Sequence, residues 1–191
     1  MEKYSIFIVL ILMFIICSVL NGNFLTKNNL INVARQLAVG TILAYGEMIL
    51  IISGMLDLSA GSVLALSGVL SVSLYKATGS LAAAFLIAIL VAVVCNLINA
   101  GMITHFNAPP FIATLAMSTV ARGAALLYTK GQNILQLGDY VVFGQGDILG
   151  IPIPIIFLIV ITVIIYYLLR HTALGRSLYA IGGNEEAAIA S

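Results

Sequence analysis

Long apolar runs without a charged side chain are the feature that most limits how this chain can fold. Residues 6–20 and 152–169 are two such runs. A helix needs about 20 mostly apolar residues to cross the hydrocarbon layer of a bilayer, which is about 30 Å thick. Six segments reach or approach that length: 6–20, 37–53, 60–75, 81–100, 111–128 and 152–169. They do not alternate apolar and polar residues as membrane-barrel strands do. We therefore predict an all-α, polytopic membrane protein with about six spanning helices.

The composition agrees with a bilayer environment and excludes several functions. Hydrophobic residues make up 62% of the chain and charged residues 8%, whereas soluble domains carry about 25% charged residues. A net charge of +1 offers no basic patch for nucleic acid. The sequence contains no HExxH motif, no paired carboxylates, no Ser/His/Asp grouping and no nucleotide phosphate loop. We expect no catalytic residue, metal site or cofactor in this chain.

Residues 37–75 form an apolar stretch with one interruption, GMLDLSAG at residues 54–61. The glycines at both ends of this interruption each disfavour helix by about 1 kcal/mol. We predict that Asp57 and Ser59 lie where the helix is broken. The segment is either a turn at a membrane face or a break at membrane depth. A break at depth is tolerated only where protein or a water-filled cavity surrounds it, as in transporters.

Ionisable groups inside apolar runs usually face the interior of the helix bundle or a cavity. Glu47 lies near the middle of its run, and Asp57 lies in the interruption. Arg122 is six residues from the end of its run, about 9 Å at 1.5 Å per residue. Its side chain either extends to the interface or pairs with one of these acids. Thr114, Ser118 and Arg122 also form a polar stripe with four-residue spacing.

Three motifs, in this order and at these spacings, resemble one family. They are GMLDLSAGS at 54–62, PPFIATL at 109–115 followed by ARG at 121–123, and TALGR at 172–176 leading into AIGGNEEAA at 180–188. The chain resembles the permease subunits of bacterial ABC sugar importers of the ribose, xylose and galactoside class. The resemblance covers essentially the whole chain. Met55 stands where this family commonly has a second glycine. The chain also ends inside the third motif, so we expect it to be the N-terminal part of a longer permease.

The resemblance implies a function and partners. The protein is expected to move a monosaccharide across the bacterial cytoplasmic membrane by alternating access, with ATP hydrolysed by a separate ATP-binding-cassette ATPase. An extracytoplasmic sugar-binding protein and a second permease subunit are the other expected partners. The polar residues expected along the translocation path are Glu47, Asp57, Ser59, Asn99, Thr114, Ser118 and Arg122.

The resemblance also implies that residues 170–191 form a cytoplasmic loop that couples the permease to the ATPase. Its expected coupling residues are Gly175, Arg176, Gly182, Gly183, Asn184, Glu185, Glu186, Ala187 and Ala188. With six crossings, both ends of the chain are then cytoplasmic. The positive-inside rule does not decide this, because three basic residues fall on one side and four on the other. We further predict a short helix over 184–190, because Asn favours the N-cap and acidic residues favour the first turn.

Two other functions are open from the residues alone. An ion-coupled secondary transporter would use Glu47 or Asp57 as its coupling carboxylate, and it would need no ATPase loop. A membrane-embedded enzyme or assembly subunit is the other class, and the missing catalytic groupings argue against the enzyme.

Overall fold

The structure is a computed structural model that describes residues 2–184 and 188. Its long helices are α1 (Glu2–Leu20), α2 (Lys27–Ile52), α3 (Ala60–Thr78), α4 (Leu81–His105), α5 (Pro110–Thr129) and α7 (Ile153–His171). Within the described residues, five helices are long and apolar enough to cross a membrane, namely α2, α3, α4, α5 and α7, and the apolar helix over Ser5–Leu20 is shorter. The all-α, polytopic fold predicted from the sequence is confirmed.

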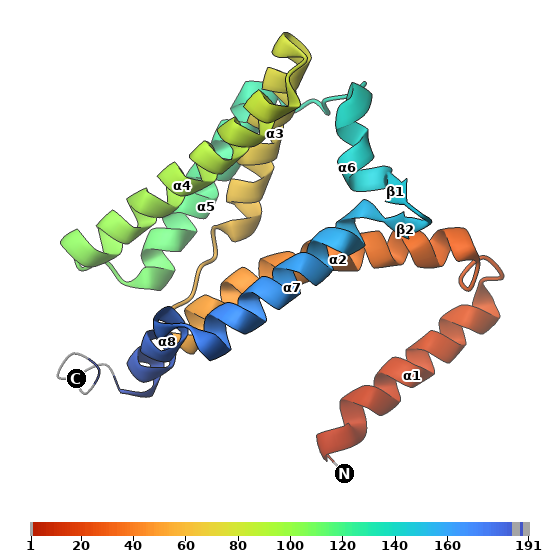
Figure 1. The fold of residues 1–191 in the computed structure, drawn as a ribbon, viewed down its shortest axis with the longest axis horizontal. Helices are drawn as coiled ribbons and strands as arrows, with labels where there is room; N and C mark the ends of the chain where they lie inside the picture. Colours follow the sequence, from red (N-terminus) through yellow and green to blue (C-terminus); the bar gives the residue numbers. More distant parts are fainter. Residues whose placement is uncertain (1, 185–187, 189–191) are drawn as a thin grey trace.

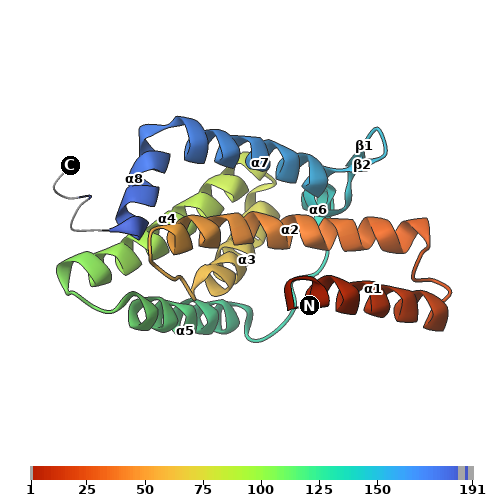
Figure 2. The same cartoon turned by 90° about the horizontal axis from the view of Figure 1, so that it is seen from below.

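Two groups of helices make up the structure (Figures 1 and 2). Helices α3, α4 and α5 pack side by side in one bundle, and α2 packs along α7 in the second group. Helix α1 stands apart from both groups and runs in the opposite direction to α2 (Figure 1). The apolar core lies in the α3–α5 bundle. It consists of Val63, Cys95, Met117 and Ala121, with Leu66, Val91 and Ala92 packed against them.

Helix α2 begins ten residues before the predicted boundary at residue 37. The Thr26 hydroxyl caps its first turn by accepting a hydrogen bond from the backbone N–H of Asn29 at 3.4 Å. Arg35, a polar residue that hydropathy places outside the span, donates through Nη2 to the carbonyl oxygen of Gln145 at 2.6 Å. The two boundaries differ because hydropathy marks the part of a helix suited to lipid, while the helix itself continues through a polar, capped turn.

The connection from α5 to α7 contains short elements that are fastened to the bundle. They are the 3₁₀ helix η1 (Gly138–Val141), α6 (Val142–Gln145), and the antiparallel strands β1 (Asp147–Ile148) and β2 (Ile151–Pro152). The hydroxyl groups of Ser71 and Tyr140 lie 2.8 Å apart, which joins η1 to α3. The Tyr140 ring also packs near Tyr75 and Phe85. This connection is therefore more ordered than a flexible linker.

The segment after α7 is a helix where the sequence predicts a loop over 170–191. Helix α8 (Ala173–Gly183) is capped by Thr172, whose hydroxyl accepts a hydrogen bond from the backbone N–H of Gly175 at 3.2 Å. Asn184 closes this helix, since its N–H donates to the Ala180 carbonyl at 3.0 Å. The Asn184 carbonyl also accepts from the N–H of Ala188 at 3.0 Å. The rest of the helix predicted over 184–190, including Glu185, Glu186 and Ala187, lies outside the described residues.

Candidate functional site

The helix is interrupted between α2 and α3, as predicted from the two glycines. Gly54, at a φ of +79°, ends α2 in the left-handed conformation that glycine adopts without strain. The N–H of Met55 bonds back to the Leu50 carbonyl at 2.9 Å, and that of Gly54 to the Ile51 carbonyl at 3.0 Å. These two bonds form a Schellman motif, a common helix end. The chain then runs without helix until α3 begins at Ala60 (Figure 1).

A buried hydrogen-bond network joins this interruption to α4. One carboxylate oxygen of Asp57, Oδ1, accepts from both the backbone N–H and the hydroxyl of Ser59, each at 2.6 Å. The Ser59 hydroxyl in turn accepts from Nδ2 of Asn99 at 3.0 Å. Ser59 is completely buried and Asn99 is 4% exposed. The two bonds to Asp57 have a charged acceptor, and such bonds are stronger than those between neutral groups.

The side-chain oxygen of Asn99 is buried without a hydrogen-bond partner among the described residues. An unsatisfied buried acceptor costs about 1–3 kcal/mol. Native structures contain few such atoms, and each calls for a physical reason. This acceptor lies in the same network as Asp57, so it gives the network one free position for a donor.

Asp57 and Glu47 line one cavity of about 320 Å³ among α2, α3 and α4. The two acids come from different elements, Glu47 from α2 and Asp57 from the interruption. Asn96 of α4 and Ser67 of α3 line the same cavity. The remaining lining is apolar, for example Ile42 and Val63. The cavity therefore presents hydrogen-bonding groups inside an otherwise apolar bundle.

Two residues predicted for the path do not line the cavity of Glu47 and Asp57. The hydroxyl groups of Ser118 and Ser62 are 2.9 Å apart, which ties α5 to α3. The Thr114 hydroxyl donates to the Pro110 carbonyl of its own helix at 2.8 Å, and Thr114 is 3% exposed. In this structure both residues make packing contacts between or within helices.

Arg122 lines a second cavity, of about 330 Å³, between α3, α5 and residues 131–137. Thr129, Gln132 and Asn133 contribute polar groups to the same cavity. The acid pairing considered from the sequence does not form, because Glu47 and Asp57 line the other cavity. Arg122 thus lines a cavity of mixed polar and apolar residues near the end of α5.

The sequence reasoning missed Asn96 and Ser67, which line the cavity with Glu47 and Asp57. Both are polar residues inside apolar runs, so the signal was present. Periodicity places a residue on a face of its helix, but it does not say which neighbouring helix that face meets. The sequence offers less indication that Tyr140 joins η1 to α3, because Tyr140 lies outside every apolar run.

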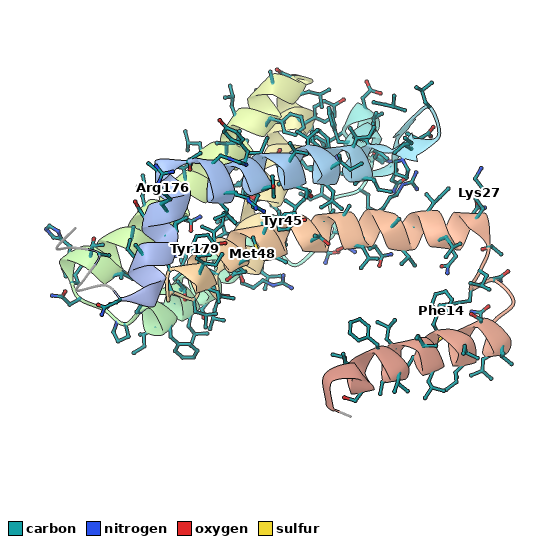
Figure 3. All side chains as sticks on the ribbon, turned by 60° about the horizontal axis from the view of Figure 1, so that its bottom comes forward. Phe14, Lys27, Tyr45, Met48, Arg176 and Tyr179 are labelled. Atoms are coloured by element: carbon teal, nitrogen blue, oxygen red, sulfur yellow. The ribbon has the colours of Figure 1, made fainter. Side chains whose placement is uncertain are left out.

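Four of the residues predicted for coupling lie on α8, whereas Asn184 caps its end and Ala188 follows it. Gly175 is buried at the turn from α7, and Arg176, Gly182 and Gly183 follow on the same helix. Helix α8 packs against the ends of both α7 and α2. Tyr45 and Met48 of α2 and Tyr179 of α8 line one cavity where these helices meet (Figure 3).

Residues 29–191 match the family described as branched-chain amino acid transport system / permease component. The chain is therefore a multi-pass membrane protein that belongs to this family of permease components.

Several curated relatives are similar along almost the whole chain. The ribose import permease protein RbsC of Bacillus subtilis is 41% identical over 194 residues, covering 100% of this chain and 60% of the relative. The D-allose transport system permease protein AlsC of Escherichia coli is 32% identical, covering 100% and 59%. The L-arabinose ABC transporter permease protein AraH of Azospirillum brasilense is 31% identical, covering 98% and 56%. The chain thus spans about 60% of the length of the first of these relatives. No solved structure matches the chain.

Proposed function

We propose that this chain is the membrane-spanning permease subunit of an ATP-binding-cassette importer and moves a monosaccharide across the bacterial cytoplasmic membrane. The observation that carries the proposal is the family match over residues 29–191, joined to relatives whose names specify ribose, D-allose and L-arabinose. The buried polar network beside a cavity supports the same function. A purely structural bundle in lipid has no need of two carboxylates on one cavity.

The chemistry of the Glu47 and Asp57 cavity suits a neutral, polyhydroxylated solute. Carboxylate oxygens accept hydrogen bonds from sugar hydroxyls, and Asn96 and Ser67 add polar groups to the same cavity. Asp57 comes from the non-helical segment between α2 and α3, so this cavity lies beside an interruption of the helix. Alternating access would open this cavity to each side of the membrane in turn.

The proposed partners are a cytoplasmic ATPase, an extracytoplasmic sugar-binding protein and a second permease subunit. The ATPase is assigned to the end of the molecule that carries α8, which places both described ends of the chain in the cytoplasm. The connection from α5 to α7 then faces outward, where a binding protein delivers sugar. Tyr140 and Lys76 hold this connection in place, and Lys76 donates through Nζ to the Leu135 carbonyl at 2.9 Å. A connection held in this way suits a docking surface of fixed shape.

The experiment that tests the proposed function is uptake of labelled sugar by proteoliposomes. The full-length protein is reconstituted with its partner ATPase and binding protein, and ribose, D-allose and L-arabinose are compared. We expect uptake of at least one sugar that needs ATP and is insensitive to a protonophore. Uptake driven by an ion gradient without the ATPase would overturn the proposal and restore the ion-coupled alternative, which the relatives do not support.

A further inference from the structure

Helix α8 approaches the end of α2 through a glycine that leaves no room for a side chain. A Cβ added at Gly182 would overlap the backbone carbonyl oxygen of Ile52 and lie 2.9 Å from its carbonyl carbon. Both obstructing atoms belong to the main chain, so no change of side-chain rotamer relieves the overlap. A Cβ at the next residue, Gly183, would meet open space. Two adjacent glycines of one helix therefore differ sharply in what they contact.

Ile52 occupies a particular position relative to the cavity acids. It is the last residue of α2, five residues after Glu47 and five residues before Asp57. Both acids line the cavity among α2, α3 and α4. The chain changes direction immediately after Ile52, at Gly54. A displacement of the Ile52 main chain therefore moves both the end of the helix that carries Glu47 and the start of the segment that carries Asp57.

The contact at Gly182 is part of a close junction. Helix α8 packs on α7 as well as on α2, and Tyr179 shares a cavity with Tyr45 and Met48 (Figure 3). Closely packed main-chain atoms have low compressibility and transmit displacement, whereas a flexible side chain absorbs it. At Gly182 helix meets helix without a side chain between them.

We propose that Gly182 is a positioning residue that couples movement of α8 to the Glu47 and Asp57 cavity through the main chain of Ile52. The proposal rests on the proposed function, because the movement of α8 is attributed to the partner ATPase. It adds a specific route within this chain. The route runs from α8 to the end of α2, along the interruption to Asp57, and through Ser59 to Asn99 on α4.

The test substitutes Gly182→Ala in the full-length protein reconstituted with its partners. Gly183→Ala is the comparison on the same helix, and Gly101→Ala in α4, also with open space at the Cβ position, is the unchanged control. A misplacement of about 1 Å at a functional site can lower a rate about 100-fold, so we expect Gly182→Ala to lower sugar uptake at least about tenfold. The amount of bound ATPase and its ATP hydrolysis should persist. Gly183→Ala should have a much smaller effect.

A second measurement is independent of how well Gly182→Ala folds. Met55 is 41% exposed and lies just after the corner formed by Ile52 and Gly54. In a protein that is otherwise wild type, Met55→Cys is labelled with a thiol reagent before and after ATP is added to the assembled complex. Leu20→Cys, at a residue 80% exposed at the end of α1, is the control. We expect ATP to shift the labelling rate at residue 55 and not at residue 20.

The outcomes separate this inference from the proposed function. Absence of ATP-dependent uptake by the wild-type complex would overturn the proposed function. Uptake by the wild type together with equal uptake by Gly182→Ala and Gly183→Ala would overturn only the role of Gly182. An unchanged labelling rate at Met55→Cys would also overturn it, even if Gly182→Ala were lost from the membrane.

Discussion

Asn99 of α4 donates a hydrogen bond through Nδ2 to the Ser59 hydroxyl at 3.0 Å, across 40 residues of sequence. The Ser59 hydroxyl in turn donates a hydrogen bond to the Asp57 carboxylate. The bond thus fixes the interruption between α2 and α3 against a different helix. Because both partners are buried, the geometry of the interruption depends on this pair more than on solvent.

Replacing Ser59 by alanine is expected to destabilise the protein. The Asn99 amide loses its acceptor, and an unsatisfied buried polar group costs about 1–3 kcal/mol. Asp57 also loses one of its two donors. A lower thermal unfolding midpoint in detergent should report the loss. Asn96→Ala is the control, since exposed Asn96 donates a hydrogen bond within its own helix, to the Ala92 carbonyl. Equal midpoints for the two variants would show that the network adds no stability.

Replacing Asp57 by asparagine tests whether its charge or its hydrogen bonds matter. The amide oxygen of Asn can still accept from the Ser59 N–H and hydroxyl, so the interruption should keep its shape. A hydrogen bond to a charged group contributes about 1.5–3 kcal/mol, against about 0.5–1.5 kcal/mol for a neutral one. We therefore expect Asp57→Asn to retain measurable ATP-dependent sugar uptake.

Asp57→Ala, which removes the acceptor altogether, should transport much less than Asp57→Asn. Glu47→Gln extends the comparison to the other acid on the cavity. If Asp57→Asn abolished uptake as completely as Asp57→Ala, with normal membrane levels of both, the carboxylate charge itself would be required. That result would favour an ion-coupled carboxylate over a hydrogen-bonding one.

The sequence was sufficient for the all-α, polytopic fold and for the interruption at Asp57, because hydropathy and glycine act locally. It was not sufficient for the partner of Ser59. Asn99 lies 40 residues away, and only the packing of α4 on α3 brings the two together. Arg122 shows the same limit. Its position within an apolar run was evident, but the choice between extending to the interface and pairing with an acid depends on which helices meet there.

The helical conformation of Gly182 and Gly183 was not evident from the sequence for a different reason. Glycine and asparagine in the sequence around residues 182–184 indicate a turn by local propensity. In the structure Gly182 and Gly183 are helical, with α8 held against α2 and α7. Tertiary packing outweighs the cost of about 1 kcal/mol for a glycine within a helix.

Replacing Tyr140 by phenylalanine is expected to loosen the connection between α5 and α7 without unfolding it. The variant loses the hydrogen bond to Ser71, a net contribution of about 0.5–1.5 kcal/mol. It keeps the ring contacts with Tyr75 and Phe85. Faster proteolysis within residues 130–152 of the reconstituted protein should reveal the change. Tyr140→Ala, which also removes the ring, should be cut faster still. Identical cleavage of wild type and both variants would mean that other contacts hold the connection.

Replacing Arg122 by leucine is expected to leave membrane insertion intact and to lower sugar uptake. A charged side chain at the centre of a spanning helix costs about 2.5–3.5 kcal/mol, so insertion should be no harder for the variant. Uptake should fall because the cavity lined by Arg122, Gln132 and Asn133 loses its charged donor. The measurement is ATP-dependent uptake normalised to the amount of protein in the membrane.

Arg122→Lys separates the charge from the shape of the guanidinium. Lysine keeps a positive charge on a flexible stem but lacks the planar fork of five N–H donors. If Arg122 binds the solute through that fork, sugar uptake by Arg122→Lys should lie between the uptake of the wild type and that of Arg122→Leu. Full uptake by Arg122→Leu would mean that the side chain only extends toward the interface, as long basic side chains do. In that case the polar path would be confined to the cavity that Glu47 and Asp57 line.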